Sequence, residues 1–126
     1  MRHLEYDIRL ATTIKALREM RRIKQAVIAA ALNMEQATYC RIEYGEIAIT
    51  PGQIKIIANV LGTSIFQIFA IVESEDLMNL KHETLSEILL KFVKMFEGTE
   101  TTTLITEEEL YYIIEKKKRY KHLTKN

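Results

Sequence analysis

Apolar residues recur every three to four positions along most of the chain, which is the spacing of one-sided helices. In the first 72 residues this pattern predicts five short helices. Their expected bounds are about 7–22, 26–32, 35–44, 51–61 and 65–71. Asn33, Gly45 and Gly62 are the expected stops, because these residue types accept a left-handed backbone. Thr50 followed by Pro51, and Ser64, are the expected helix starts.

Two further helices are predicted after the acidic segment 73–76. The first has a broad apolar face and is expected to end at Gly98. Its apolar residues are Leu85, Ile88, Leu89, Phe92, Met95 and Phe96. The second covers about 107–121, starts with a capping box formed by Thr106 and Glu109, and carries Leu110, Ile113, Ile114 and Lys117 on one side. The fold class is therefore all-α, with five short helices followed by a two-helix C-terminal extension.

Charge is distributed unevenly along the chain, although the net charge is only +1. Residues 1–72 contain 9 basic and 6 acidic side chains, residues 73–115 contain 3 and 11, and the last eleven residues contain 6 and none. The shift at Glu73 suggests a helical domain over 1–72 and an extension over 73–126. The basic end most simply complements a helix C-terminus, and contact with nucleic acid is the alternative.

Composition excludes several classes of protein. With 126 residues, 48% of them hydrophobic, the chain can form one compact core, and a single cysteine, Cys40, cannot form an internal disulfide. No apolar run approaches the roughly 18 residues that span a bilayer, and the N-terminus lacks a signal peptide's apolar stretch. We therefore expect a cytoplasmic protein with no membrane partner.

Enzymatic motifs are not evident. His3, His82 and His122 lie far apart and have no cysteine or carboxylate at metal-ligand spacing. A phosphate-binding glycine loop is also missing from a chain with four glycines. The sequence predicts no catalytic residues, no metal and no cofactor.

One ordered set of residues is more specific than composition. It consists of Leu17-Arg18, Gln25, Ile28-Ala29, Leu32-Asn33, Ile42-Glu43-Tyr44-Gly45 and Ile57-Ala58 with Leu61-Gly62 and Ser64. In this order the residues resemble the helix-turn-helix of the lambda-repressor-like family, also called the Xre or Cro/CI type. The resemblance covers about residues 8–71 and implies a five-helix DNA-binding domain whose third helix is the recognition helix.

The outer face of the third predicted helix has the chemistry to read bases in a major groove. Arg41 suits guanine, Gln36 suits adenine, Thr38 bonds to either, and Ala37 can touch a thymine methyl group. These four residues are the expected base contacts.

Other motif residues are expected to hold the backbone or the fold. Lys24 and Gln25 at the start of the second helix, and Tyr44 at the end of the third, are expected phosphate contacts. The resemblance implies that Arg18 and Glu43 form an ion pair joining the first helix to the end of the recognition helix.

The sequence departs from the family pattern in three places. Arg22 and Lys24 stand where small or capping residues are usual, and Glu35 adds a negative charge near the DNA. The loop 46–49 lacks basic residues, which predicts weaker binding by one domain. Ile47 and Ile49 are expected to pack on a partner or on the C-terminal extension.

The extension is expected to mediate self-association or to bind a partner, because its apolar faces need cover. The predicted interface residues are Leu85, Ile88, Leu89, Phe92, Phe96, Leu110, Ile113 and Ile114. The alternative is that these helices pack on the first domain as additional core.

Taken together, the residues and the resemblance favour a transcriptional regulator that binds a two-fold site on double-stranded DNA as a homodimer. Repression is the expected mode of regulation. Two alternatives stay open. The chain is an antitoxin whose extension wraps a toxin, or a protein-interaction adaptor that has lost DNA binding. A protein antagonist is a further possible partner of the extension.

Overall fold

The computed structural model describes residues 5–81 and 105–124, and every regular element in these ranges is a helix. The helices are α1 (Glu5–Met20), α2 (Gln25–Ala31), α3 (Gln36–Glu43), α4 (Pro51–Leu61), α5 (Ile65–Lys81) and α7 (Glu107–Thr124). The predicted all-α class is confirmed. The predicted sixth helix, with Leu85, Ile88, Leu89, Phe92 and Phe96, lies outside the described residues.

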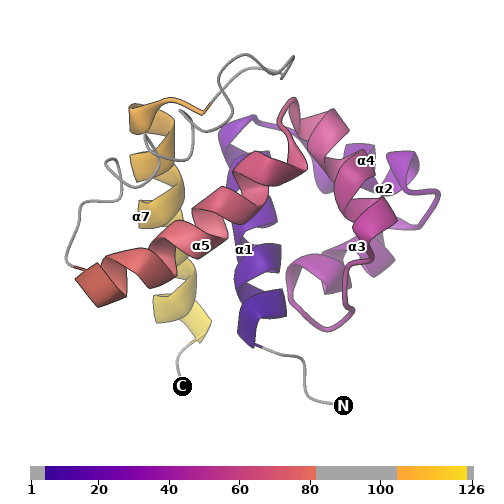
Figure 1. The fold of residues 1–126 in the computed structure, drawn as a ribbon. Helices are drawn as coiled ribbons and strands as arrows, with labels where there is room; N and C mark the ends of the chain where they lie inside the picture. The colour runs from indigo at the N-terminus through magenta and orange to yellow at the C-terminus, as the bar shows by residue number, and fades with distance from the viewer. Residues whose placement is uncertain (1–4, 82–104, 125–126) are drawn as a thin grey trace.

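Helix α1 is the central element of the fold. It packs against α3, α5 and α7, while α2 packs against α3 and α4. In Figure 1, α2, α3 and α4 gather on one side of α1 and α7 lies on the other, with α5 crossing α1 obliquely. Two segments far apart in the sequence, the start of the chain and its last helix, therefore lie side by side.

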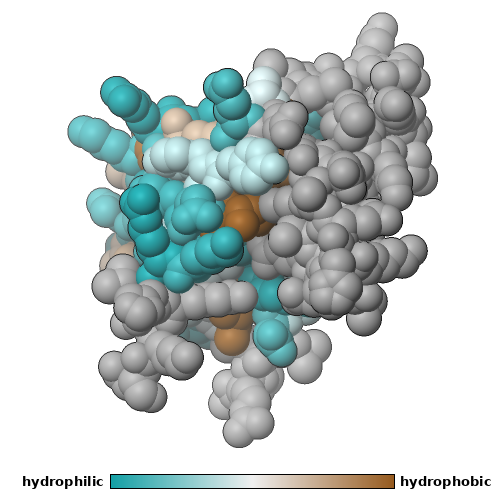
Figure 2. All heavy atoms as spheres, turned by 90° about the vertical axis from the view of Figure 1, so that its left-hand side faces the viewer, coloured by the Kyte–Doolittle hydropathy of each residue, from teal (hydrophilic) through white to brown (hydrophobic). Residues whose placement is uncertain are grey.

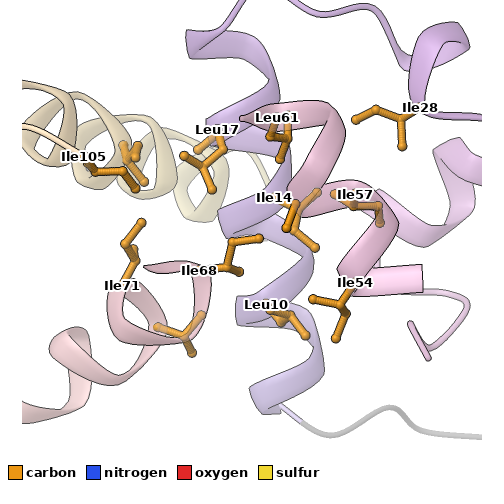
Figure 3. Close-up of a cluster of buried hydrophobic side chains, with 14 of the residues drawn as sticks. Leu10, Ile14, Leu17, Ile28, Ile54, Ile57, Leu61, Ile68, Ile71 and Ile105 are labelled. Carbon is orange, nitrogen blue, oxygen red and sulfur yellow. The ribbon is translucent and has the colours of Figure 1, made fainter. Parts of the chain in front are cut away.

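The core forms around one stripe of α1. Leu10, Ile14 and Leu17 follow helical spacing and point toward side chains of the other helices, as Figure 3 shows. The buried side chains that complete this cluster include Ile28, Ile54, Ile57, Leu61, Ile68, Ile71, Ile105, Leu110 and Ile113. Helix α1 contacts α3 and α5 as well as α7, so its apolar stripe joins the N-terminal helices and the last helix in one core.

The predicted helix ends agree with the backbone. Asn33, Gly45 and Gly62 have φ angles of 55°, 79° and 70°, all left-handed. Thr50 forms a capping box with Gln53, with bonds of 3.0 and 3.2 Å between backbone and side chains. These local signals are short-range, so the sequence is sufficient to place them.

Arg22 also has a left-handed backbone, with φ of 57°, and the sequence analysis did not predict this. It lies in the turn between α1 and α2, where the amide of Ile23 bonds to the carbonyl of Arg18 at 3.0 Å. A non-glycine residue in this conformation is uncommon, so the hydrogen bonds of the turn hold it there.

The fifth helix is longer than predicted. We expected it to end near Ile71, but α5 continues to Lys81 and includes the acidic segment 73–76. A change in charge does not interrupt backbone hydrogen bonds, and residues 72–81 contain neither glycine nor proline. The expected boundary at residues 72 and 73 therefore lies inside a helix, and the division into 1–72 and 73–126 stays a prediction.

Helix α7 packs on α1 and does not present a free apolar face. Leu110 and Ile113 are fully buried in the core of the single chain, and Ile114 packs partly buried against it. The structure places Leu110 and Ile113 in the core of the single chain, as the alternative of additional core describes, whereas Ile114 stays a predicted interface residue. Among the described residues on the side of the molecule that Figure 2 shows, most are hydrophilic and a few are hydrophobic.

Polar contacts fix α7 in its position on α1. Glu19 accepts hydrogen bonds from the hydroxyl of Tyr120 and, at 3.3 Å, from the Nζ of Lys116. Arg21 bonds to Glu109 at 3.0 Å. Burial alone would raise the pKa of Glu19, but the bonds from Tyr120 and Lys116 hold it below its ordinary value. The partners on α7 therefore stabilise the charged form of the Glu19 carboxylate.

The loop after α3 contributes to the core through its two isoleucines. Ile47 and Ile49 are partly buried and pack against the core of the chain itself. Their burial accounts for apolar residues in a loop without requiring a partner.

No single helix among the described residues is both long and apolar enough to cross a membrane. Residues 51–61 and 65–73 meet the length and hydropathy criteria only as a pair, and this pair bends by 101° at its break.

Candidate nucleic-acid interface

Helix α3 has two sharply different faces. Tyr39, Ile42 and Glu43 are buried, at spacings of three and four residues. Ala37, Arg41 and Tyr44 are exposed and follow the spacing i, i+4, i+7 on the opposite side. Amphipathic spacing thus anchors one face of α3 in the core and leaves the other available to a partner.

The predicted base-contacting residues lie on or beside this exposed stripe. Gln36, Ala37 and Arg41 are exposed, and Thr38 is half-buried. Gln36 and Thr38 are about 200° apart around the helix, so an amide and a hydroxyl lie on the two flanks of the stripe that carries the Arg41 guanidinium. These groups can match the donor and acceptor patterns of base pairs in a major groove.

The end of α3 is fixed to α1 by a buried ion pair. Arg18 donates from Nε and Nη2 to the two carboxylate oxygens of Glu43, at 2.6 and 3.0 Å. The Glu43 side chain is 2% exposed and that of Arg18 is 12% exposed. Arg18 also donates to the carbonyl of Ile23 at 2.9 Å, which ties the turn between α1 and α2 to the same pair.

Electrostatics at this pair follow from burial and from its geometry. Burial alone would lower the pKa of Arg18, but the hydrogen bonds and charge of Glu43 raise it above its ordinary value. Burial and the neighbouring Glu43 likewise raise the pKa of Tyr39. The Arg18 guanidinium therefore stays charged, and Tyr39 stays neutral, throughout the ordinary pH range.

Gln25 has a structural contact that the sequence analysis missed. Its Nε2 donates to the Oε1 of Glu43 at 2.9 Å, so part of its hydrogen-bonding capacity is used inside the fold. The motif placed Gln25 at the start of α2 but gave no distance to Glu43, which lies 18 positions further along the chain. Only the packing of α2 on α3 brings the two together.

Arg41 also has an intramolecular partner. Its Nε lies 3.1 Å from Glu46 in the loop after α3, and both side chains are about 60% exposed. An exposed pair of this kind contributes little free energy, so it does not lock Arg41. The signal was available in the sequence as opposite charges five residues apart across a helix end.

The expected phosphate contacts are placed differently from one another. Lys24 is exposed at the N-terminus of α2, where its side chain makes no capping bond. Tyr44 is 67% exposed at the end of α3, with the Nζ of Lys15 5.7 Å from its ring centre. The start of α3 likewise has no side-chain cap from Glu35. The amides at these two helix starts are therefore not occupied by their capping residues.

No group of three or more histidine, cysteine, aspartate or glutamate side chains with metal-binding geometry is found in the ranges 5–81 and 105–124. Cys40 lies on α3 and is half-buried, without a disulfide. The exposed charged side chains on and beside α3 are Arg41 and the carboxylates Glu35 and Glu46.

Helix α2 packs against α3, and α3 presents an exposed face and is joined to α1 by a buried ion pair. Residues 14–68 match the family described as helix-turn-helix. This part of the chain is a lambda-repressor-like, DNA-binding helix-turn-helix domain, as the motif residues indicated. The family comprises regulatory DNA-binding domains and not enzymes. Comparison with curated proteins and with solved structures finds no match at a significant level.

Proposed function

We propose that the protein is a sequence-specific transcriptional regulator that binds a two-fold operator as a homodimer and represses by occluding it. The observation that carries the proposal is the exposed stripe of α3 on a helix held rigidly by the Arg18–Glu43 pair. A reading surface must keep its geometry to discriminate between bases, and this anchor provides that rigidity.

Each exposed residue has a role in this proposal. Arg41 bonds to guanine and Gln36 to adenine, Thr38 donates or accepts at either, and Ala37 contacts a thymine methyl group. Lys24 and Tyr44 bind phosphates and set the register of the domain on the duplex. Gln25 serves first as a partner of Glu43 and adds at most one further donor toward a phosphate.

Glu46 modulates this surface. It neutralises Arg41 in the free protein, and the pair must open for Arg41 to reach a base. Because the pair is exposed, opening it costs little, although the Glu46 carboxylate then remains close to the DNA phosphates. A single domain should therefore bind weakly, and joining two domains in a dimer compensates.

The packing of α7 bears on the antitoxin alternative. A segment that wraps a toxin is commonly unfolded before it binds, whereas α7 is helical and packed on α1 in the single chain. This favours a regulator over an antitoxin. The dimer surface would then involve Leu85, Ile88, Leu89, Phe92 and Phe96, which remain predicted interface residues.

Selection of bound duplexes from a random library tests the proposal. We expect an enriched inverted repeat, and a dimer by sedimentation analysis. The Arg41→Ala variant should lose about ten- to a hundredfold in affinity for that repeat and lose preference at one base position of each half-site.

Two variants serve as controls for Arg41→Ala. Lys24→Ala should weaken binding equally for all sequences. It should also reduce the slope of log affinity against log salt concentration by about one. Arg119→Ala removes an exposed guanidinium from α7 and should change neither affinity nor preference. If no duplex is enriched and no binding occurs even at low salt, the DNA-reading proposal fails and the adaptor alternative takes its place.

A further inference from the structure

A cavity of about 340 Å³ lies where α1, the end of α3 and α7 meet. Helix α1 lines it with Ile8, Thr12 and Lys15, which share one face at the spacing i, i+4, i+7. Tyr44 closes it from the end of α3, and Tyr120 closes it from α7. The cavity is within the lower range of volumes typical of small-molecule sites.

Lys15 is held at this cavity by aromatic rings. Its Nζ lies 4.2 Å from the centre of the Tyr120 ring and 5.7 Å from that of Tyr44. Cation–π contacts of this kind place the ammonium group while leaving its hydrogen-bond donors able to bind an anion. Two helices that are far apart in the sequence thus position one lysine.

The charged groups around the cavity are mostly cationic. Arg9, Lys15 and Lys117 line it, and Glu43 is the one acidic side chain among its lining residues. The Glu43 carboxylate already accepts three hydrogen bonds, two from Arg18 and one from Gln25. The Glu43 carboxylate is therefore bound by Arg18 and Gln25.

Most of the remaining wall is apolar. Ile8, the rings of the two tyrosines and the aliphatic stem of Lys15 form it. A ligand that suits this wall has an apolar body and one negative group.

We propose that this cavity is a binding site for a small amphipathic organic anion. The ligand's carboxylate bonds to the Lys15 ammonium group, and its hydrocarbon or aromatic body packs against Ile8 and the rings of Tyr44 and Tyr120. The site does not depend on DNA binding by the protein.

The cavity borders the end of the recognition helix, α3. Gly45 ends α3 so close to α1 that a Cβ on it would lie 3.2 Å from the Cγ1 of Ile8. Tyr44 both lines the cavity and is a proposed phosphate contact. A bound anion that displaces Ile8 or Tyr44 would change affinity for DNA; this consequence, unlike the site itself, rests on the proposed function.

The test is a titration of the full-length chain, without DNA, followed by amide NMR shifts. Octanoate and benzoate are the anionic probes, with octan-1-ol and benzyl alcohol as their neutral counterparts and inorganic phosphate as an anion without an apolar body. We expect saturable shifts from octanoate or benzoate centred on residues 8–15, 44–45 and 117–120. The neutral counterparts and phosphate should bind at least about tenfold more weakly, as expected on losing one charge-assisted hydrogen bond or the apolar contact.

Three lysine variants assign the binding to the cavity. Lys15→Met should weaken binding of the anionic probe about tenfold, and Lys15→Arg should largely retain it. Lys55→Met removes the same charge from the exposed surface of α4 and should leave binding unchanged. Thr12→Leu fills the cavity without removing charge and should also weaken binding, which covers the case in which Lys15→Met does not fold.

Three outcomes would overturn the proposal. One is the lack of saturable shifts at these residues with either anionic probe. Another is equal binding of the neutral counterparts, and the third is equal loss in Lys15→Met and Lys55→Met. Repeating the titration with the enriched duplex bound then asks separately whether the anion changes DNA affinity, so a failure of DNA binding leaves the first result intact.

Discussion

Helix α1 holds the recognition helix on one side and α7 on the other, and the two contacts use charge differently. At α3, Arg18 and Glu43 meet in a buried pair whose carboxylate is 2% exposed. At α7, Glu19 and Lys116 meet in a pair whose side chains are 28% and 22% exposed. The guanidinium of Arg18 bonds to Glu43 through two nitrogens, whereas Lys116 bonds to Glu19 and Arg21 bonds to Glu109 through one nitrogen each.

This difference teaches what each contact is suited to do. A buried pair contributes geometry, since removal of one partner leaves an unpaired charge in the core. A partly solvated pair is replaceable, because water can take the place of either partner. The protein therefore holds its recognition helix rigidly and holds α7 by contacts that are easier to break. A third pair, Arg41 with Glu46, is more exposed than either of these two.

The largest expected effect is at the buried pair. Glu43→Ala leaves Arg18 unpaired and removes the partner of Gln25, so we expect a loss of about 3–5 kcal/mol in the free energy of unfolding. The double variant Arg18→Met, Glu43→Leu should lose less than Glu43→Ala alone. Urea denaturation followed by circular dichroism measures all three proteins. A loss in the double variant at least as large as that in Glu43→Ala would contradict a structural role that depends on pairing.

The α7 contact is expected to be weaker. Glu19→Gln removes the charge that Lys116 and Tyr120 bind, and we expect a loss of about 1 kcal/mol, discounted for partial exposure. Hydrogen exchange should show the loss mainly in the amides of α7. Glu115→Gln is the matched control. Glu115 lies on α7 in an exposed pair with Lys118, so its substitution should change stability little.

The same carboxylate predicts a dependence on pH. The pKa of Glu19 is lowered in the folded chain, so its contribution is present above the unfolded value of about 4.3 and is lost as pH falls below it. Protection of α7 should therefore decrease from about pH 5 downward in the wild type. In Glu19→Gln this acid dependence should be smaller, and an unchanged dependence would assign it to other carboxylates.

The smallest effect on stability is expected at the exposed pair. Glu46→Gln should change the free energy of unfolding by less than about 0.5 kcal/mol. It should raise affinity for DNA about three- to tenfold, because Arg41 is released and one negative charge is removed near the phosphates. Glu35→Gln removes a charge that has no contact with Arg41, so it should raise affinity without changing base preference. A stability loss above 1 kcal/mol in Glu46→Gln would show that this pair supports the fold.

Much of the N-terminal domain could be predicted because its signals are local. The helix start at Thr50 and the left-handed turns at Asn33 and Gly45 depend on neighbouring residues, and each was placed from the sequence. The Arg18–Glu43 pair was also expected, although from the family resemblance and not from spacing. The exposed side of α3 followed from amphipathic spacing alone.

Other features were missed because they depend on which surfaces meet. The acidic segment 73–76 suggested a boundary, yet α5 continues through it, since helical hydrogen bonds are indifferent to a change of charge. Leu110 and Ile113 looked like interface residues because the sequence shows an apolar face but not what covers it. Lys117 was placed on the apolar side of its helix, but its hydrogen bond of 2.7 Å to Thr13 required the packing of α7 on α1.

The sequence by itself therefore determined the helices that local capping and periodicity specify, the helix-turn-helix motif and the chemistry of the recognition face. The tertiary structure alone decided that α7 covers α1, that Gln25 supports Glu43, and that Lys15 lies between Tyr44 and Tyr120 beside a cavity. The physical reason is range. Helix formation and capping act over a few residues, whereas these contacts join side chains between 18 and 105 positions apart, and only the packing of α1 against the other helices brings them together.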